Sequence, residues 1–380
     1  MAIKLCNAGV PLQIQSASYT VSEAVSHLPS TREHISPCYY PKTTCEKLLP
    51  RKHVDHLDVG SPDVPTFAIK VTSFKGGGTA IGILVFHCIL DASAMFKFME
   101  NWSKCYRGLD LQPKPVHDRA AVTQLPTTKA ASEQAEKEIA KKIQVVAQTE
   151  KYVPAFAAMM PKISGGHACV IPCPGDELKA WKASATAQLP SDVPFVSTDD
   201  VITARVWQAM VKLRCEQVGL SLESEEPTTI MRAFNIRCRT KPPLGESFCG
   251  NGVSNVWTVL SVRDCIRMTP GQIAARLRAT INFWTPDLIA ARAKWEQGHH
   301  EKGSHTKTAF DRFALTFVVS SWRFNWEVSD FNSKPICFDH GALVPIVAVL
   351  TPRNQCDGVN VWVSGKEDDM QKFVKHLKTK

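Results

Sequence analysis

Apolar residues along the first third of the chain follow two spacings, one typical of strands and one typical of helices. Residues 67–74 and 81–86 form two apolar runs, and the glycines at 76–78 between them predict a β-hairpin. Apolar residues at three- and four-residue spacing follow directly and predict a helix over 92–106. The helix face that we expect toward the core carries Met95, Phe98, Met99 and Trp102.

The second half of the chain predicts a longer series of the same two elements. Ser197 and Asp200 stand at capping-box spacing before an apolar stripe, so a helix should begin at about residue 198. Further strands are expected at 229–237, 252–262, 313–322, 342–350 and 358–365, and further helices at 271–281 and 368–378. Long strands that alternate with helices in both halves predict an α/β class with mixed sheets.

The stretch between the two halves is polar and charged. Over residues 127–152 only Ile139, Ile143 and Val146 share an apolar face. We therefore expect a connecting segment with an exposed helix that does not belong to a core. A strand at 167–172 and a short helix at 175–185 should follow it.

Composition and charge limit the functional classes in part. The chain has 380 residues, of which 44% are hydrophobic and 21% charged, a balance that excludes disordered and fibrous proteins. The net charge of +9 favours anionic partners such as phosphates, but no dense basic cluster with interleaved aromatic residues suggests nucleic acid. No apolar run approaches the roughly 18 residues of a membrane helix. Without a signal-peptide pattern, we expect a cytoplasmic protein.

Cysteine is common, but its pattern does not suggest a metal centre. Thirteen cysteines are scattered along the chain. Cys169 and Cys173 have a spacing that a metal site could use, yet no second pair of Cys or His stands at zinc-finger distance. We expect no metal, and reduced, buried thiols in the apolar runs.

The strongest candidate for chemistry is the segment VFHCILDASAM at residues 85–95. His87 stands where a strand ends, and Asp91 follows at the start of a helix. An imidazole at a strand end can act as a general base for a hydroxyl or an amine. The residues alone leave an alternative open, in which His87 is a satisfied core histidine and Asp91 is the N-cap of the helix.

Further segments, in order along the chain, resemble the motifs of one enzyme family. They are STDDVITARVWQ at 197–208, NIRCRTKPPLGESFCGNG at 235–252, VVSSWRFNWEVSDFNSKP at 318–335 and VNVWVSGKEDDMQKFVKHL at 359–377. Together with the HxxxD pattern of His87 and Asp91, they make the chain resemble the BAHD acyltransferases, a family of CoA-dependent enzymes. The resemblance covers most of the chain.

The resemblance implies an α/β fold of two similar lobes with mixed β-sheets flanked by helices, similar to chloramphenicol acetyltransferase. The N-terminal lobe with the HxxxD motif would span residues 1–112, a crossover segment 113–190, and the C-terminal lobe 191–380. A channel between the lobes would admit acyl-CoA, as a co-substrate, and a small-molecule acceptor. The resemblance further implies a monomer with no permanently bound cofactor, no metal, no nucleic acid and no membrane contact.

The resemblance also implies a role for each residue of the HxxxD motif. His87 would deprotonate the acceptor hydroxyl or amine, which then attacks the thioester carbonyl, and the tetrahedral intermediate would expel CoA thiolate. Asp91 would be structural and would pair with an arginine that holds the histidine loop. Arg237 is the first choice for this partner and Arg239 the reserve.

Two pairs of residues near the C-terminus complete the implied site. Ser320 and Trp322 match the family positions that stabilise the oxyanion, although they could equally be a strand residue and a buried aromatic. Asp330 and Phe331 begin the segment that matches the family motif Asp-Phe-Gly-Trp-Gly, which supports the fold and the CoA channel.

The chain departs from the family pattern in three places. Ala92 and Ala94 replace two glycines after the HxxxD motif, so the loop should be strained or rearranged if the first position needs a positive φ. The Asp-Phe-Gly-Trp-Gly segment is one residue shorter, although Asn332 can tolerate a left-handed turn. The NAGVPL stretch at 7–12 is similar to the second strand of the family, so we expect the first strand and helix to be missing.

Two alternative functions follow from these departures and from the fold. One is a catalytically weak or inactive family member that binds CoA or another ligand. The other is a condensation domain of peptide synthesis, which shares the two-lobed architecture and has an HHxxxD motif. Phe86 precedes His87 here, which favours free acyl-CoA as the donor.

Overall fold

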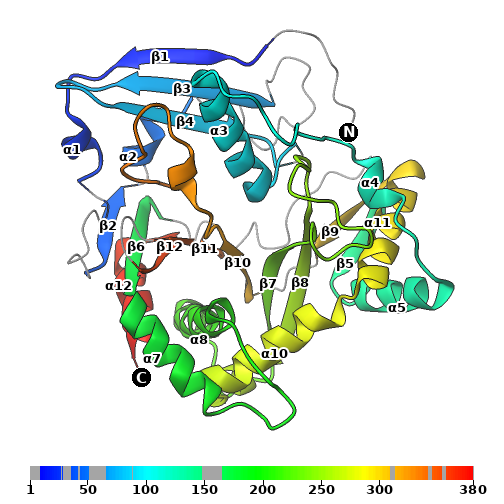
Figure 1. Cartoon of the computed structure of the whole chain (residues 1–380). Coiled ribbons are helices and arrows are strands. Elements are labelled where there is room, and N and C mark those ends of the chain that lie inside the picture. The colour runs from blue at the N-terminus through cyan, green and yellow to red at the C-terminus, as the bar shows by residue number, and fades with distance from the viewer. Residues whose placement is uncertain are drawn as a thin grey trace.

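A computed structural model of the chain describes residues 9–26, 28, 36–41, 43–50, 66–87, 89–147, 165–308, 313–340, 345–352 and 357–379. These residues form a seven-stranded sheet, a three-stranded sheet and a two-stranded sheet, with helices packed around them (Figure 1). The α/β class with mixed sheets that the sequence predicts is confirmed.

The seven-stranded sheet is the centre of the molecule. Its strands, in spatial order, are β2 (Cys38–Pro41), β6 (His167–Pro174), β12 (Gly358–Gly365), β11 (Val347–Pro352), β10 (Thr316–Ser321), β7 (Pro227–Asn235) and β8 (Val253–Ser261). Strand β10 pairs in parallel with β7 and β11, and the other pairs are antiparallel. The carboxyl ends of β7, β10 and β11 therefore meet at one edge of the sheet.

Two strands of this sheet come from segments that the sequence assigns elsewhere. β2 lies in the expected N-terminal lobe and β6 in the expected crossover, yet β6 pairs with both β2 and β12. Antiparallel pairing satisfies the backbone groups of β12, which would otherwise be a bare edge. The sheet therefore extends across the limits at residues 112 and 190, and the division into lobes at those residues stays a prediction.

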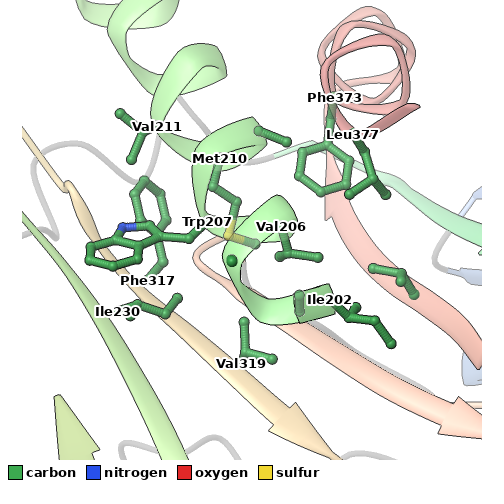
Figure 2. Packing of buried hydrophobic residues seen from close by; sticks show 14 of the residues in the cluster. Ile202, Val206, Trp207, Met210, Val211, Ile230, Phe317, Val319, Phe373 and Leu377 are labelled. Carbon is green, nitrogen blue, oxygen red and sulfur yellow. The ribbon is translucent and has the colours of Figure 1, made fainter. Parts of the chain in front are cut away.

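Four helices cover one face of the large sheet. They are α7 (Gly175–Thr186), α8 (Thr198–Val218), α10 (Pro270–Phe283) and α12 (Glu367–Lys378), and the short α9 (Val262–Arg267) follows β8. The capping box of Ser197 and Asp200 at the start of α8 is confirmed. Figure 2 shows Ile202 and Val206 of α8 among side chains of the strands and of α12. This core fixes α8 on the sheet, and with it the residues at the N-terminus of the helix.

The three-stranded sheet contains the predicted hairpin. Its order is β1 (Leu12–Ser16), β3 (Phe67–Ser73) and β4 (Thr79–Val85), and the three turn glycines at 76–78 have positive φ. The helices α1 (Val21–Ala24) and α2 (Thr43–Glu46) lie in the segment between β1 and β3. The strand expected at 7–12 begins only at Leu12, and residues 7 and 8 lie outside the described part.

The predicted helix after the hairpin is α3 (Ala92–Tyr106). The four side chains that we expect toward the core are only half-buried. Phe98 packs on Phe67 of β3 with ring centroids 5.0 Å apart, and Phe96 packs on Phe324, beyond β10, at 4.7 Å. The helix therefore lies between the small sheet and the chain that follows the large sheet.

The polar middle segment is more ordered than its composition predicts. It forms α4 (Ala120–Thr123), α5 (Lys129–Ile139) and β5 (Ile143–Ala147), which pairs with β9 (Ser304–Thr308) after α11 (Pro286–Glu301). Ala131, Ala135 and Ile139 of α5 are buried in a cluster with Trp284 and Leu288. The prediction of an exposed helix outside any core is wrong, because the alanines at four-residue spacing make a buried stripe.

None of the helices in the described ranges has the length and apolar content that a membrane-spanning helix needs. Within the same ranges, no three His, Cys, Asp or Glu side chains form a group that could hold a metal ion. Cys169 and Cys173 lie buried in β6, and burial raises the pKa of the Cys169 thiol.

Candidate active site

His87 lies in the loop between the end of β4 and the start of α3. Its side chain is solvent-exposed, so the alternative of a satisfied core histidine is wrong. The backbone carbonyl of His87 accepts a hydrogen bond of 2.6 Å from the Nδ2 atom of Asn251. Asn251 belongs to the loop between β7 and β8, so the large sheet fixes the backbone of the histidine while the imidazole stays accessible.

Asp91 makes two kinds of contact at once. Its Oδ1 atom accepts a hydrogen bond of 2.8 Å from the backbone N–H of Ala94, so it is the N-cap of α3. Arg237 donates to both carboxylate oxygens at 3.0 Å, and the backbone N–H of Gly252 donates to Oδ2 at 2.7 Å. The carboxylate therefore joins the first turn of α3 to both ends of the loop between β7 and β8.

Arg237 is buried and surrounded by acceptors. Its Nε atom donates to the carbonyl of Phe248 at 3.1 Å, and a terminal nitrogen donates to the carbonyl of Gly250 at 2.7 Å. A Cβ atom at position 252 would lie 2.8 Å from the guanidinium carbon, so the close approach of the backbone requires Gly252. With Asp91 only 4% exposed and Arg237 only 8% exposed, the pair is bidentate and shielded from water.

The second arginine of the motif lies elsewhere. Arg239 does not contact Asp91, and its guanidinium lies 5.7 Å from the ring centre of Phe234. The two arginines therefore point in different directions: Arg237 points toward the histidine loop, and Arg239 lines a cleft at the N-terminus of α8.

The two alanines after the HxxxD motif cause no backbone strain. Ala92 is the first residue of α3, and among the described non-glycine residues only Ala314 and Asn332 have positive φ. The expected strain is therefore absent, because the Asp91 cap draws this segment directly into a helix. Asn332 does adopt the left-handed turn that the sequence allows, with φ 64°.

Ser320 and Trp322 stand at the carboxyl end of β10, on the sheet face opposite α8. The indole Nε1 of Trp322 donates to Oγ of Ser320 at 3.0 Å. This bond occupies the indole donor and leaves the hydroxyl proton of Ser320 available for another acceptor. Of these two side chains, only Ser320 can donate a hydrogen bond to a bound molecule in this arrangement.

Aromatic side chains surround Trp322. Its ring lies 6.4 Å from that of Phe96, 6.1 Å from Phe338 and 4.5 Å from His340. Burial lowers the pKa of His340 to about 4 against the opposing charge of Asp339, so this imidazole is neutral at pH 7. His340 lies outside every motif of the chain, and a lone histidine in the sequence carries no signal of its own.

Asp330 and Phe331 contact the C-terminal part of α3. Oδ2 of Asp330 lies 3.9 Å from Arg107, and the ring of Phe331 packs on Trp102 at 5.1 Å and on Tyr106 at 5.6 Å. Both residues therefore bind the segment after β10 to the helix that follows the histidine loop.

A basic cleft of about 480 Å³ opens at the N-terminus of α8. Its lining consists of Lys182, Ser197, Thr198, Asp199, Arg232, Arg239, Arg278, Ile281 and Arg323. Five of these side chains are cationic, and one of them, Arg323, forms an ion pair with Asp199, the one carboxylate among the lining residues. Such an excess of positive charge in a hollow attracts anions.

A buried carboxylate holds two of these arginines in place. Asp200 is fully buried, and it accepts hydrogen bonds from Arg232 at 2.8 Å and from Nε of Arg278 at 2.9 Å. Burial alone would raise the pKa of Asp200, but the charge of Arg232 and the hydrogen bonds from Ser197 outweigh it, and the pKa lies below its usual value. Asp200 therefore stays ionised and orients both arginines.

The basic cleft adjoins the segments that carry the other candidate residues. Arg239 lies two residues beyond Arg237, and Arg323 directly follows Trp322. Because two residues of extended chain span at most about 7 Å, the Cα atom of Arg239 lies within about 7 Å of that of Arg237.

The net charge of the sequence indicated an anionic partner. It did not identify these five cationic residues, because they come from five separate segments of the chain.

The chain matches one protein family and is similar to named enzymes of plants. The Transferase family matches residues 15–380. The hydroxycinnamoyl-CoA:5-hydroxyanthranilate N-hydroxycinnamoyltransferase HHT4 of Avena sativa is 23% identical over 347 residues, which make up 89% of this chain and 73% of that protein. The omega-hydroxypalmitate O-feruloyl transferase of Arabidopsis thaliana is 25% identical over 278 residues, or 72% of this chain and 55% of that protein.

A solved structure matches the fold. The crystal structure of F. sporotrichioides TRI101, complexed with coenzyme A and T-2, aligns with a TM-score of 0.70 at 20% identity and covers 96% of this chain and 78% of that chain. This likeness confirms the fold that the sequence predicts.

The ion pair between Asp91 and Arg237 generates a prediction about stability. Asp91→Ala leaves a charged guanidinium buried without its partner, so the free energy of unfolding should fall by about 3–5 kcal/mol. Arg237→Ala should cause a loss of similar size. Because both substitutions remove the same contacts, the double variant should lose clearly less than the sum of the two single losses. Urea denaturation followed by circular dichroism measures all three values.

The control for this cycle is Asp110→Ala, at an exposed carboxylate beyond the end of α3. Its free energy of unfolding should stay within about 0.5 kcal/mol of the wild-type value. Strictly additive losses in the double variant would show that the two side chains act independently.

Proposed function

We propose that this chain, which belongs to the Transferase family of BAHD-type acyltransferases, moves an acyl group from acyl-CoA to a hydroxyl or amine of a small-molecule acceptor. The observation that carries the proposal is the exposed His87 on a loop held by Asn251 and by the buried pair of Asp91 and Arg237. The oat relative is named for an amine acceptor and the Arabidopsis relative for a hydroxyl acceptor.

His87 acts as the general base. Its imidazole takes the proton from the acceptor, and the freed electron pair attacks the thioester carbonyl carbon. The carbon–sulfur bond of the tetrahedral intermediate then breaks, and the imidazolium returns its proton to the departing CoA thiolate. The protein thus ends each cycle in its starting protonation state, without an acyl-enzyme.

Asp91 contributes by positioning and not by chemistry. Both of its oxygens are engaged by Arg237, and they also accept hydrogen bonds from backbone N–H groups. A carboxylate so occupied does not exchange protons with a substrate. It fixes the loop instead, and a base displaced by about 1 Å can lose roughly 100-fold in rate.

Ser320 supplies the hydrogen bond to the oxyanion. Its Oγ already accepts the indole proton of Trp322, which orients the hydroxyl and leaves its own proton to donate. A donor of this kind stabilises an oxyanion by roughly 3 kcal/mol. In this arrangement Trp322 is a positioning residue for Ser320.

The basic cleft holds the phosphates of acyl-CoA. Its five cationic side chains match a ligand that carries three phosphate groups, and Asp200 keeps Arg232 and Arg278 in place before the ligand arrives. The solved relative TRI101 was crystallised with coenzyme A. Arg232 and Arg278 pair with Asp200, and Arg323 pairs with Asp199. Lys182 and Arg239 pair with neither carboxylate, so they are the cations whose loss should perturb the fold least.

The role of His87 is tested by His87→Ala. The rate of acyl transfer should fall by about 100- to 10,000-fold, because no base then takes the acceptor proton. The melting temperature should not change, because the imidazole is exposed. The matched control is His117→Ala, at another exposed histidine, which should keep the wild-type rate. Free CoA thiol is the readout.

Equal rates for wild type and His87→Ala would overturn the general-base role. If the folded wild type releases no CoA with any donor while still binding it, the protein is a CoA-binding member of the family without transferase activity.

The basic cleft gives a second prediction. Lys182→Ala and Arg239→Ala should each raise the KM for acyl-CoA by roughly 10- to 150-fold, the equivalent of about 1.5–3 kcal/mol per charged hydrogen bond, and should leave kcat nearly unchanged. With the same acyl group on N-acetylcysteamine, which lacks the phosphates, KM should not respond. Lys129→Ala, on the distant surface of α5, is the control. An equal rise in KM for both donors would contradict phosphate binding at the basic cleft.

A further inference from the structure

One exposed aromatic side chain stands beside the basic cleft. Phe195 is 54% exposed, and the guanidinium carbon of Arg278 lies 5.2 Å from its ring centre. Arg278 is at the same time part of the lining of the basic cleft. Tyr106, the other aromatic among the large apolar side chains that are exposed in the described ranges, packs on Phe331.

The backbone holds Phe195 firmly in this place. Val196, the next residue, is 1% exposed and belongs to the main core. Ser197 then caps α8, and its backbone N–H donates to Asp200 at 2.7 Å. The backbone beside Phe195 is therefore fixed by a core contact and a helix cap, and in this place the side chain of Phe195 is 54% exposed.

Arg278 holds the ring from its own side. Nε of Arg278 donates to Asp200 at 2.9 Å, and a terminal nitrogen donates to Oγ of Ser197 at 2.9 Å. The guanidinium therefore has a fixed position over the ring of Phe195. Because Phe195 stays 54% exposed despite this contact, it offers apolar surface next to a residue of the basic cleft.

We infer that Phe195 stacks on the adenine ring of acyl-CoA while the basic cleft binds its phosphates; the inference rests on the proposed function. An aromatic ring next to basic side chains is the arrangement that binds a base and its phosphates together, and stacking on one base is worth roughly 5- to 150-fold in affinity. The ligand class is an adenosine 3′,5′-bisphosphate group. Phe195 thus distinguishes a full CoA donor from thioesters that lack the nucleotide.

Binding of free adenosine 3′,5′-bisphosphate, measured by calorimetry, tests the inference. Phe195→Ala should weaken binding at least 5-fold, whereas Phe195→Tyr and Phe195→Trp, which keep a ring, should stay within about 3-fold of wild type. Inorganic pyrophosphate, which has no base, should bind wild type and Phe195→Ala equally. Leu222→Ala, at an exposed apolar residue elsewhere, is the matched control.

The outcomes separate this inference from the proposed function. If Phe195→Ala binds the bisphosphate as tightly as wild type while Lys182→Ala binds it more weakly, the basic cleft takes phosphates and the stacking role of Phe195 is wrong. A wild type that does not bind the bisphosphate also overturns the inference. If wild type catalyses no transfer but binds the bisphosphate through Phe195, the inference stands and the proposed reaction fails.

Discussion

The position of His87 depends on the buried contact between Asp91 and Arg237. The two residues are 146 positions apart in the chain, and their bidentate pair joins the end of the small hairpin to a loop of the large sheet. Both charges are largely shielded from water, so each stabilises the fold only while the other is present. Asn251, on the same loop, adds a hydrogen bond to the histidine backbone. The imidazole of His87 can therefore stay exposed while its backbone is held in place.

The same end of the large sheet brings the other candidate residues together. Short segments leave the carboxyl ends of β7 and β10, and each carries one residue toward α3 or its N-cap and another toward the basic cleft. Arg237 and Arg239 divide in this way on one segment, and Trp322 and Arg323 do so on the other. Parallel pairing of β7 with β10 sets both segments side by side. A bound donor that reaches both faces of this edge would have its phosphates and its thioester fixed by the same sheet.

Local patterns predicted much of this structure because they report local physics. The hairpin, the cap of α8 and the Asp91 cap of α3 each depend on residues close together in sequence. The basic cleft could not be predicted, because its cations come from five segments that only the fold brings together. The buried stripe of α5 was missed because its alanines look neutral by composition, yet they fit closely against α11. The roles of His87 and Ser320 remain predictions that the resemblance and the geometry support.

Free CoA release that depends on an acceptor tests the central claim most directly. Purified wild-type protein would be mixed with acetyl-, malonyl-, benzoyl-, hydroxycinnamoyl- or longer-chain acyl-CoA, each with and without pooled alcohols and amines, and the products followed by mass spectrometry. The account predicts release of CoA from at least one donor only when an acceptor is present, with an equal amount of acylated acceptor. Release at the same rate without any acceptor would mean thioester hydrolysis, and it would contradict acyl transfer.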